Sequence, residues 1–462
     1  MAEKNAIPTE LGTEKISVLL KQYALPAIIA QTASSLYNMV DSIFIGQGVG
    51  PLAISGLAVT FPLMNLSTAF GTLVGAGAAT MLSVLLGQKN YKAANKVLGN
   101  VVTLNTIIGI VFMAVALIFI DPILYFFGAS ENTLPFAKEY ITIILIGNVI
   151  THLYFGLNAA MRSSGNPKKA MGLTIFTVIF NTILDPIFIF VFDMGIAGAA
   201  WATVIAQTAA MLIVIAHFNN KSRPFHFEKG IFRLDTRVAK DSLAIGMGPF
   251  LMNAAACLVT LFINQQLRDY SGDLGIGAYG ICNRFIFMFI MICMGLNQGM
   301  QPIAGYNYGA RQYSRVREVL WKTIRLGMLM TTICFIFGVF FPKAAVGIFT
   351  HDEQLLELSA RALRITTIAF PIVGFQMIGT NFFQSLGMVR KSIILSLSRQ
   401  ILFLLPLIYF LPLWFGSDGV WISFPISDLL ATLLSIYMLG RLFGKFNKLK
   451  DGDDSSILGS QL

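Results

Sequence analysis

Carboxylate and hydrogen-bonding side chains recur at helical spacing inside long apolar stretches of the first half of the sequence. Tyr37 and Asp41 are four residues apart, and so are Asn181 and Asp185. This spacing places each pair on one face of a helix. Placing an ionised group in hydrocarbon costs at least about 2.5–3.5 kcal/mol, so carboxylates in these stretches indicate a structural or functional role. Long neighbouring stretches contain no acidic residue at all, among them 42–120, 141–184 and 358–417.

These side chains could together bind a small cation. Thr203 and Gln207 repeat the four-residue spacing, so three polar pairs could converge on one buried cluster. Carboxylate, amide and hydroxyl oxygens are ligands that hard cations prefer. Two carboxylates in one dry site cannot both ionise cheaply, so a pair formed by Asp41 and Asp185 could hold a proton or Na⁺ and lose it when the site hydrates. The alternative, which applies most to Gln207, is that these residues only join helices by hydrogen bonds.

Two prolines fall beside these polar pairs. Pro186 follows Asp185 directly, and its missing N–H leaves the carbonyl of Thr182 without a helical donor, which predicts a kink. Pro26 lies in the same apolar stretch as Asp41 and predicts a bend there. A bend that changes with protonation would couple the polar cluster to the rest of the protein, and a static kink is the alternative.

The second half carries a different set of charges in its apolar stretches. Arg284, Arg399 and Asp428 are the ionisable residues, and we interpret them as a structural ion network because buried charges are usually paired. The matching faces of the second half carry no acid, and the stretches 241–267 and 355–385 offer the amides Asn264, Gln265, Gln376, Asn381 and Gln384.

Composition indicates which elements position these groups. The chain has 462 residues, of which 55% are hydrophobic and 12% charged, with a mean hydropathy of +0.71. Soluble proteins have about 25% charged residues, so a soluble globule is excluded. Apolar stretches of at least about 20 residues predict membrane helices. The twelve predicted spans are 17–46, 52–86, 95–122, 135–161, 169–192, 196–218, 241–267, 275–304, 316–342, 355–385, 391–414 and 418–442.

The two halves of the sequence repeat each other. "GQKNYKAANKVLG" from Gly87 resembles "GARQYSRVREVLW" from Gly309, and Gly165 and Gly387 differ by the same 222 positions. We predict an all-α membrane protein with twelve transmembrane helices in two pseudo-symmetric six-helix lobes around a central cavity. The predicted parts are an N-terminal lobe (1–225), a cytoplasmic linker (226–240), a C-terminal lobe (241–450) and a disordered tail (451–462).

Lysine and arginine are distributed unevenly between the predicted connections. If both termini are cytoplasmic, 26 of the 33 basic residues fall on the inner side. The positive-inside rule therefore predicts cytoplasmic termini and an even number of spans. The net charge of +10 is spread over many loops and does not indicate nucleic acid. Nucleotide-binding, HExxH and GxSxG motifs are absent, so we expect no enzyme and no cofactor, with an ion gradient as the energy source.

Five segments stand out in order across both halves: "SSLYNMVDSIFIG", "NTILDPIF", "GIAGAAWATVIAQ", "GAYGICNRF" and "FPISDLL". Together they resemble the multidrug and toxic compound extrusion (MATE) transporters over about residues 26–440. The resemblance implies export of organic cations, amphipathic drugs or metabolites in exchange for H⁺ or Na⁺. In the DinF-like branch, which the missing C-lobe acids favour, the coupling-ion cluster matches Tyr37, Asp41, Asn181, Asp185 and Thr203.

Two functions stay open beside this resemblance. The first is an ion-coupled multidrug antiporter, with Na⁺ ligated by Asp41, Asn181 and Asp185 if Na⁺ is the ion, and with Gln207, Pro26 and Pro186 in support. The second is a flippase for lipid-linked precursors, which shares the design of the wider superfamily but should need a cationic cavity. For either function we expect a monomer in the prokaryotic plasma membrane.

Overall fold

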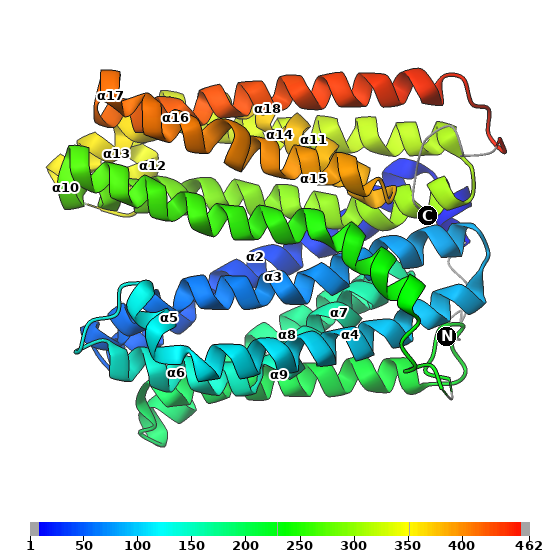
Figure 1. Cartoon of the computed structure of the whole chain (residues 1–462), viewed down its shortest axis with the longest axis horizontal. Helices are drawn as coiled ribbons and strands as arrows, with labels where there is room; N and C mark the ends of the chain where they lie inside the picture. The colour runs from blue at the N-terminus through cyan, green and yellow to red at the C-terminus, as the bar shows by residue number, and fades with distance from the viewer. Residues whose placement is uncertain (1–8, 229, 351, 454–462) are drawn as a thin grey trace. The chain divides into compact units, whose positions relative to one another are not determined.

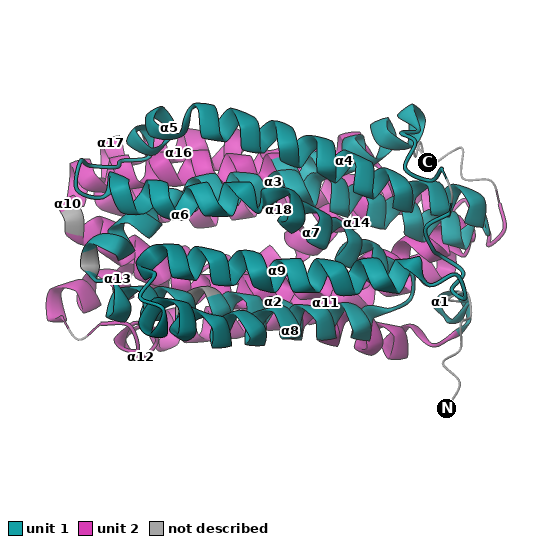
Figure 2. Cartoon of the chain, turned by 90° about the horizontal axis from the view of Figure 1, so that it is seen from below, with its two compact units in different colours: residues 1–13, 29–250, 462 teal, residues 14–28, 251–461 magenta. Residues whose placement is uncertain are grey.

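Helices make up all the regular structure in the part of the chain that the computed structural model describes, residues 9–228, 230–350 and 352–453. Contacts divide the chain into two compact units, which are coloured separately in Figure 2. Unit 1 contains residues up to Thr13 and Ile29–Phe250, and unit 2 contains Glu14–Ile28 and the residues from Leu251 onward.

Unit 1 is a bundle of long helices that run side by side (Figure 1). Its cores are apolar, and one of them packs Ile45, Ile189 and Ile196 around Tyr140. The elements are α1 (Glu10–Thr13), α2 (Ile16–Gly48) from Ile29 onward, α3 (Pro51–Gly87), α4 (Tyr91–Ile118), α5 (Ile120–Phe126), α6 (Leu134–Ile146), α7 (Asn148–Ser163), α8 (Pro167–Pro186), the π-helix η1 (Ile187–Val191), α9 (Gly195–Asn219) and α10 (Thr236–Gly309) as far as Phe250.

Unit 2 is built in the same way, and one of its apolar cores includes Trp421 on its last helix. Its part of α10 is interrupted at Gly272, which has a φ of 62°. The other elements are α11 (Tyr313–Phe340), α12 (Pro342–Gly347), α13 (Glu353–Thr366), α14 (Phe370–Ser385), α15 (Val389–Leu397), the π-helix η2 (Ser398–Leu404), α16 (Leu405–Phe410), α17 (Pro412–Phe415) and α18 (Ser417–Phe446).

The helices agree with a protein that crosses the membrane many times. Among the described residues, nine helices are long and apolar enough to span a bilayer, and two bent pairs bring the number to eleven. α2, with 33 residues, adds a further helix of spanning length, which is consistent with the twelve predicted spans. The spans predicted at 135–161 and 355–385 are not straight, because α6 and α7 bend by 53° and α13 and α14 by 58°.

The backbone repeats between the units at the turns. Lys89 and Arg311, 222 positions apart, both follow a helix in the left-handed region, with φ of 59° and 58°. Gly165 and Gly387, at the same offset, have φ of 92° and 69°. Left-handed residues are uncommon outside glycine, so a non-glycine pair with matching conformation at one offset is a structural trace of the duplication.

The first long helix of each predicted lobe is shared between the units. The part of α2 up to Ile28 groups with unit 2, where a Cβ on Gly299 would lie less than 3.0 Å from the Cα of Ala24. Residues 236–250 of α10 group with unit 1, where a Cβ on Gly77 would overlap the carbonyl oxygen of Ser242. Glycine is needed at both places because the backbones approach too closely for a Cβ. The units therefore differ from the predicted lobes 1–225 and 241–450 at these two segments.

The predicted linker and tail are both packed against helices. Within 226–240, Glu228 accepts a hydrogen bond from Asn95 of α4 (2.8 Å), and Asp235 forms an ion pair with Lys96 of α4 (3.2 Å). After α18, Asp451 accepts hydrogen bonds from the N–H (2.9 Å) and the hydroxyl (2.5 Å) of Ser314. Residues 451–453, expected in a disordered tail, thus contact the start of α11, and 454–462 lie outside the described residues.

Candidate ion-binding site

Four of the predicted polar residues form a hydrogen-bonded chain in unit 1, across α2, α8 and α9. The hydroxyls of Tyr37 and Thr203 are 2.9 Å apart. The amide of Asn181 is best oriented with its oxygen toward Thr203, where it accepts from the N–H (3.0 Å) and the hydroxyl (3.3 Å). Its nitrogen then donates to Asp185 Oδ2 (3.0 Å). In this orientation the Thr203 hydroxyl donates to Asn181 and accepts from Tyr37, so the direction of every hydrogen bond from Tyr37 to Asp185 is defined.

The two carboxylates of the site are buried and lack a cationic partner. Asp41 is 5% exposed and Asp185 is fully buried. Neither forms an ion pair within the described part of the chain, and Asp41 Oδ1 has no hydrogen-bond partner there. Asp41 lies close enough to Asp185 and to Tyr37 to interact with both electrostatically. Two uncompensated carboxylates in an apolar interior must be neutralised by a proton or a cation.

The site contains a tyrosine that the sequence did not reveal. Tyr140 of α6 is 1% exposed and interacts electrostatically with Asp41, Asp185 and Tyr37. A single phenol in an apolar stretch resembles an ordinary core residue, and no polar residue four positions away singles it out as part of a pair. The only available signal is that tyrosine hydroxyls need a polar partner when they are buried.

The remaining residues predicted to support the site have different positions. α8 ends at Pro186 and continues as η1, in which the N–H of Phe192 donates to the carbonyl of Ile187, so the predicted kink is a π-helical turn. Gln207 makes no hydrogen bond with the chain of bonds from Tyr37 to Asp185 and instead hydrogen-bonds Thr151 of α7. Pro26 lies inside α2 and belongs to unit 2, outside the unit that contains the site.

The predicted ion network of the second half is a single pair. Arg399, at the start of η2, binds Asp428 of α18 through Nε and Oδ1 at 2.5 Å. Asp428 is 1% exposed, and its Oδ2 has no partner among the described residues. Arg284 is an exposed side chain on α10 without an ion pair in the described residues. The structure therefore brings together two of these three residues.

A duplicated all-helical membrane protein with a buried, unneutralised carboxylate pair in one half belongs to the class of membrane transporters. The sequence pattern of the MatE family matches residues 26–187 and 247–410, and the chain belongs to this family. The predicted resemblance and the all-α fold are thereby confirmed. The chain is a multi-pass membrane transporter and not an enzyme.

Individual relatives resemble the chain over most of its length. The multidrug export protein MepA of Staphylococcus aureus (strain MRSA252) is 28% identical over 423 residues, covering 91% of this chain and 93% of MepA. MepA of Staphylococcus haemolyticus (strain JCSC1435) is 27% identical over 420 residues, with coverage of 91% and 92%.

Solved structures share the fold as well. The MATE multidrug transporter DinF-BH, solved as a complex with a small molecule, superposes with a TM-score of 0.88 at 35% identity, covering 95% of this chain and 98% of that one. An outward-facing multidrug resistance MATE family transporter superposes with a TM-score of 0.90 at 22% identity, covering 97% of this chain and 100% of that one.

Proposed function

We propose that this transporter is an antiporter that exports organic cations, amphipathic drugs or metabolites in exchange for H⁺ or Na⁺. The observation that carries the proposal is the burial of Asp41 and Asp185 without any cationic partner in the described residues. A mobile cation that neutralises them would stabilise one state of unit 1, and its release would stabilise another. A cycle of binding and release is what coupling to an ion gradient requires.

The hydrogen-bonded chain assigns a role to each residue of the site. Asp41 and Asp185 accept the proton or ligate Na⁺, and Asn181 keeps Asp185 oriented through its amide N–H. Tyr37 and Thr203 connect α2 to α9, so that a change of charge at the carboxylates can move α2 relative to α8 and α9. If the ion is Na⁺, its ligands come from Asp41, Asn181 and Asp185.

The named relatives support a drug-like substrate. MepA is named as a multidrug export protein, and DinF-BH is named as a multidrug transporter and was solved with a small molecule bound. The acidic site in unit 1 favours cationic substrates over the anionic headgroups that a flippase for lipid-linked precursors would move. The distribution of Lys and Arg supports cytoplasmic termini in a prokaryotic plasma membrane, and we propose that the protein acts as a monomer.

The test is transport of a fluorescent organic cation into or out of liposomes under an imposed pH gradient or an imposed Na⁺ gradient. We expect one of the two gradients to drive transport, and we expect Asp41→Asn and Asp185→Asn each to abolish the driven component. The matched control is Asp121→Asn, which removes an exposed carboxylate that is paired with Lys138 at 2.8 Å. Full transport by either site variant under the gradient that drives the wild type would refute the coupling role.

A further inference from the structure

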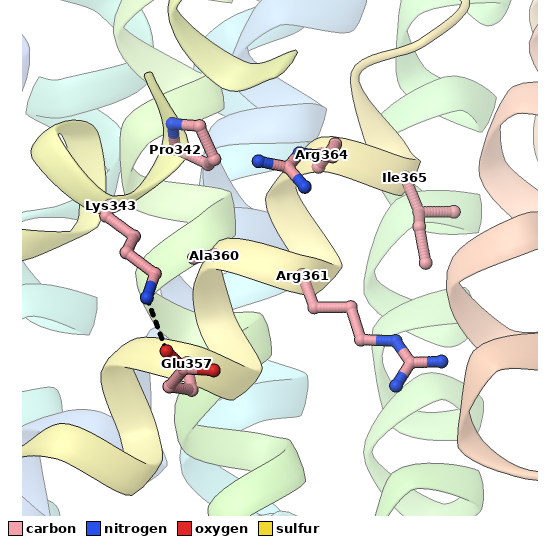
Figure 3. A pocket seen from close by; sticks show the side chains of 7 residues that line it. All are labelled: Pro342, Lys343, Glu357, Ala360, Arg361, Arg364 and Ile365. Atoms are coloured by element: carbon pink, nitrogen blue, oxygen red, sulfur yellow. Dashed lines mark hydrogen bonds and ion pairs between the residues drawn. The ribbon is translucent and has the colours of Figure 1, made fainter. Parts of the chain in front are cut away.

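A pocket with charged residues in its lining lies at the far end of α11 in unit 2, away from the α10–α11 connection. Its volume is about 420 Å³, and it is formed by α12 and α13 (Figure 3). The charged residues that line it are Lys343, Arg361, Arg364 and Glu357. Three cations against one carboxylate give the lining a positive charge.

Two of the three cations are paired, and the third is not. Lys343 binds Glu357, and Arg361 reaches away from that pair to bind Asp418 at the start of α18 (Figure 3). These pairs are weak because their side chains are largely exposed, 66% for both Lys343 and Arg361. Arg364 has no acidic partner among the described residues.

The guanidinium of Arg364 is held in place but keeps free donors. Its Nε donates to the carbonyl of Val339 near the end of α11 (3.2 Å). This bond fixes the plane of the Arg364 guanidinium and ties α13 to the end of α11. The two terminal nitrogens have no hydrogen bond in the described structure, and Figure 3 shows the group turned toward Pro342. Such a fork matches two oxygens of one phosphate.

The position of these cations is unusual for a membrane protein. With both termini cytoplasmic, as proposed above, 26 of the 33 basic residues fall on the inner side, and three of the other seven line this pocket. Connections on the outer side of a membrane protein usually contain few Lys and Arg. A cluster of three such residues at the outer end of unit 2 therefore indicates an anionic ligand that binds there.

Apolar surface beside the pocket indicates what that ligand is. Phe340 and Phe341, directly before Pro342, are 64% and 56% exposed, and Ile348 after α12 is 78% exposed. Exposed large apolar side chains at the end of a membrane helix contact acyl chains. The cations therefore lie at the level of the lipid headgroups.

We propose that this pocket binds the headgroup phosphate of an anionic phospholipid in the outer leaflet. Arg364 holds two phosphate oxygens through its terminal nitrogens, and Lys343 adds a second positive charge. The acyl chains lie along the exposed phenylalanines at the end of α11. Inorganic phosphate could satisfy the same donors, but it would gain nothing from the apolar surface. The site is independent of the ion-binding site in unit 1.

Native mass spectrometry of the purified full-length protein tests this proposal. The probes are phosphatidylglycerol, phosphatidylcholine and inorganic phosphate, each added to delipidated protein. We expect preferential retention of phosphatidylglycerol, reduced about fivefold in Arg364→Gln, because one basic group near a membrane surface changes lipid affinity by about that factor. Arg364→Lys should recover part of the retention, since it restores the charge without the fork.

Two further variants keep the result interpretable. Lys343→Gln leaves Glu357 unpaired, so it should also lower retention, and it does not disturb the bond to Val339 that Arg364 makes. Lys138→Gln, which removes an exposed lysine paired with Asp121 in unit 1, should retain the lipid as the wild type does. Unchanged retention in correctly folded Arg364→Gln and Lys343→Gln would overturn the proposal. Displacement of the lipid by inorganic phosphate at equal concentration would overturn the choice of ligand.

Discussion

The hydroxyl of Thr203 is the central link of the ion-binding site, and its removal has a calculable effect. Thr203→Val keeps the shape of the side chain but leaves the hydroxyl of the half-buried Tyr37, 2.9 Å away, without its partner. An unsatisfied hydroxyl costs about 1–3 kcal/mol when it is fully buried, so the variant should lose stability toward the lower end of that range. Tyr37→Phe should cost less, about 0.5–1.5 kcal/mol, because Thr203 still donates to Asn181.

The double variant separates this bond from packing effects. Removing both partners leaves no orphaned Tyr37 hydroxyl, so Tyr37→Phe/Thr203→Val should be more stable than the sum of the single variants predicts, by about 1 kcal/mol. Unfolding in mixed detergent micelles, followed by tryptophan fluorescence, gives the free energy of unfolding of the wild type, the two single variants and the double variant. Thr203→Ser, which keeps the hydroxyl, serves as the control. Costs that add to within about 0.3–0.5 kcal/mol would show that the two hydroxyls are not coupled, and the directional chain would be wrong.

Two other predictions concern the packing around the site and the tail. Gly77→Ala should destabilise unit 1 by about 1–3 kcal/mol, because its Cβ would overlap the carbonyl of Ser242. Gly172→Ala, inside α8 with open space around it, should instead stabilise the protein by up to about 1 kcal/mol, and thermal unfolding of both variants tests this. Burial opposes the ionisation of Asp451, but hydrogen bonds from Ser314 outweigh it, and the pKa of Asp451 is lowered. The tail contact should therefore stabilise the protein above about pH 4 and be lost as the pH falls below it, and Asp451→Asn should flatten this part of the pH–stability curve.

Helical spacing was sufficient to predict the contact between Asn181 and Asp185, because two polar residues four positions apart on a helix share a face wherever the helix lies. It could not predict which residue a polar side chain meets on another helix. Gln207 has the same spacing from Thr203, yet it hydrogen-bonds Thr151 of α7. The orientation of α9 against α7 decides that contact, and it depends on packing along the whole helix.

Burial was the second property that the sequence left open. Tyr140 resembles a core residue and lies beside the carboxylates, while Arg284 resembles a buried charge and is exposed. In a soluble protein, polarity predicts exposure, but a membrane helix is apolar on all faces. The sequence therefore shows that Arg284 is unusual without showing which face it occupies.

The duplicated backbone gives the two units different electrostatics. In unit 1 the carboxylates of Asp41 and Asp185 have no fixed countercharge among the described residues, so their neutralisation depends on an ion from outside. In unit 2 the buried acid, Asp428, is already bound to Arg399 at 2.5 Å. A covalently tethered cation cannot leave, so this acid needs no ion from a gradient to balance its charge. The proposed antiport mechanism therefore places the reversible ion site in unit 1, and it assigns the Arg399–Asp428 pair of unit 2 a permanent structural role.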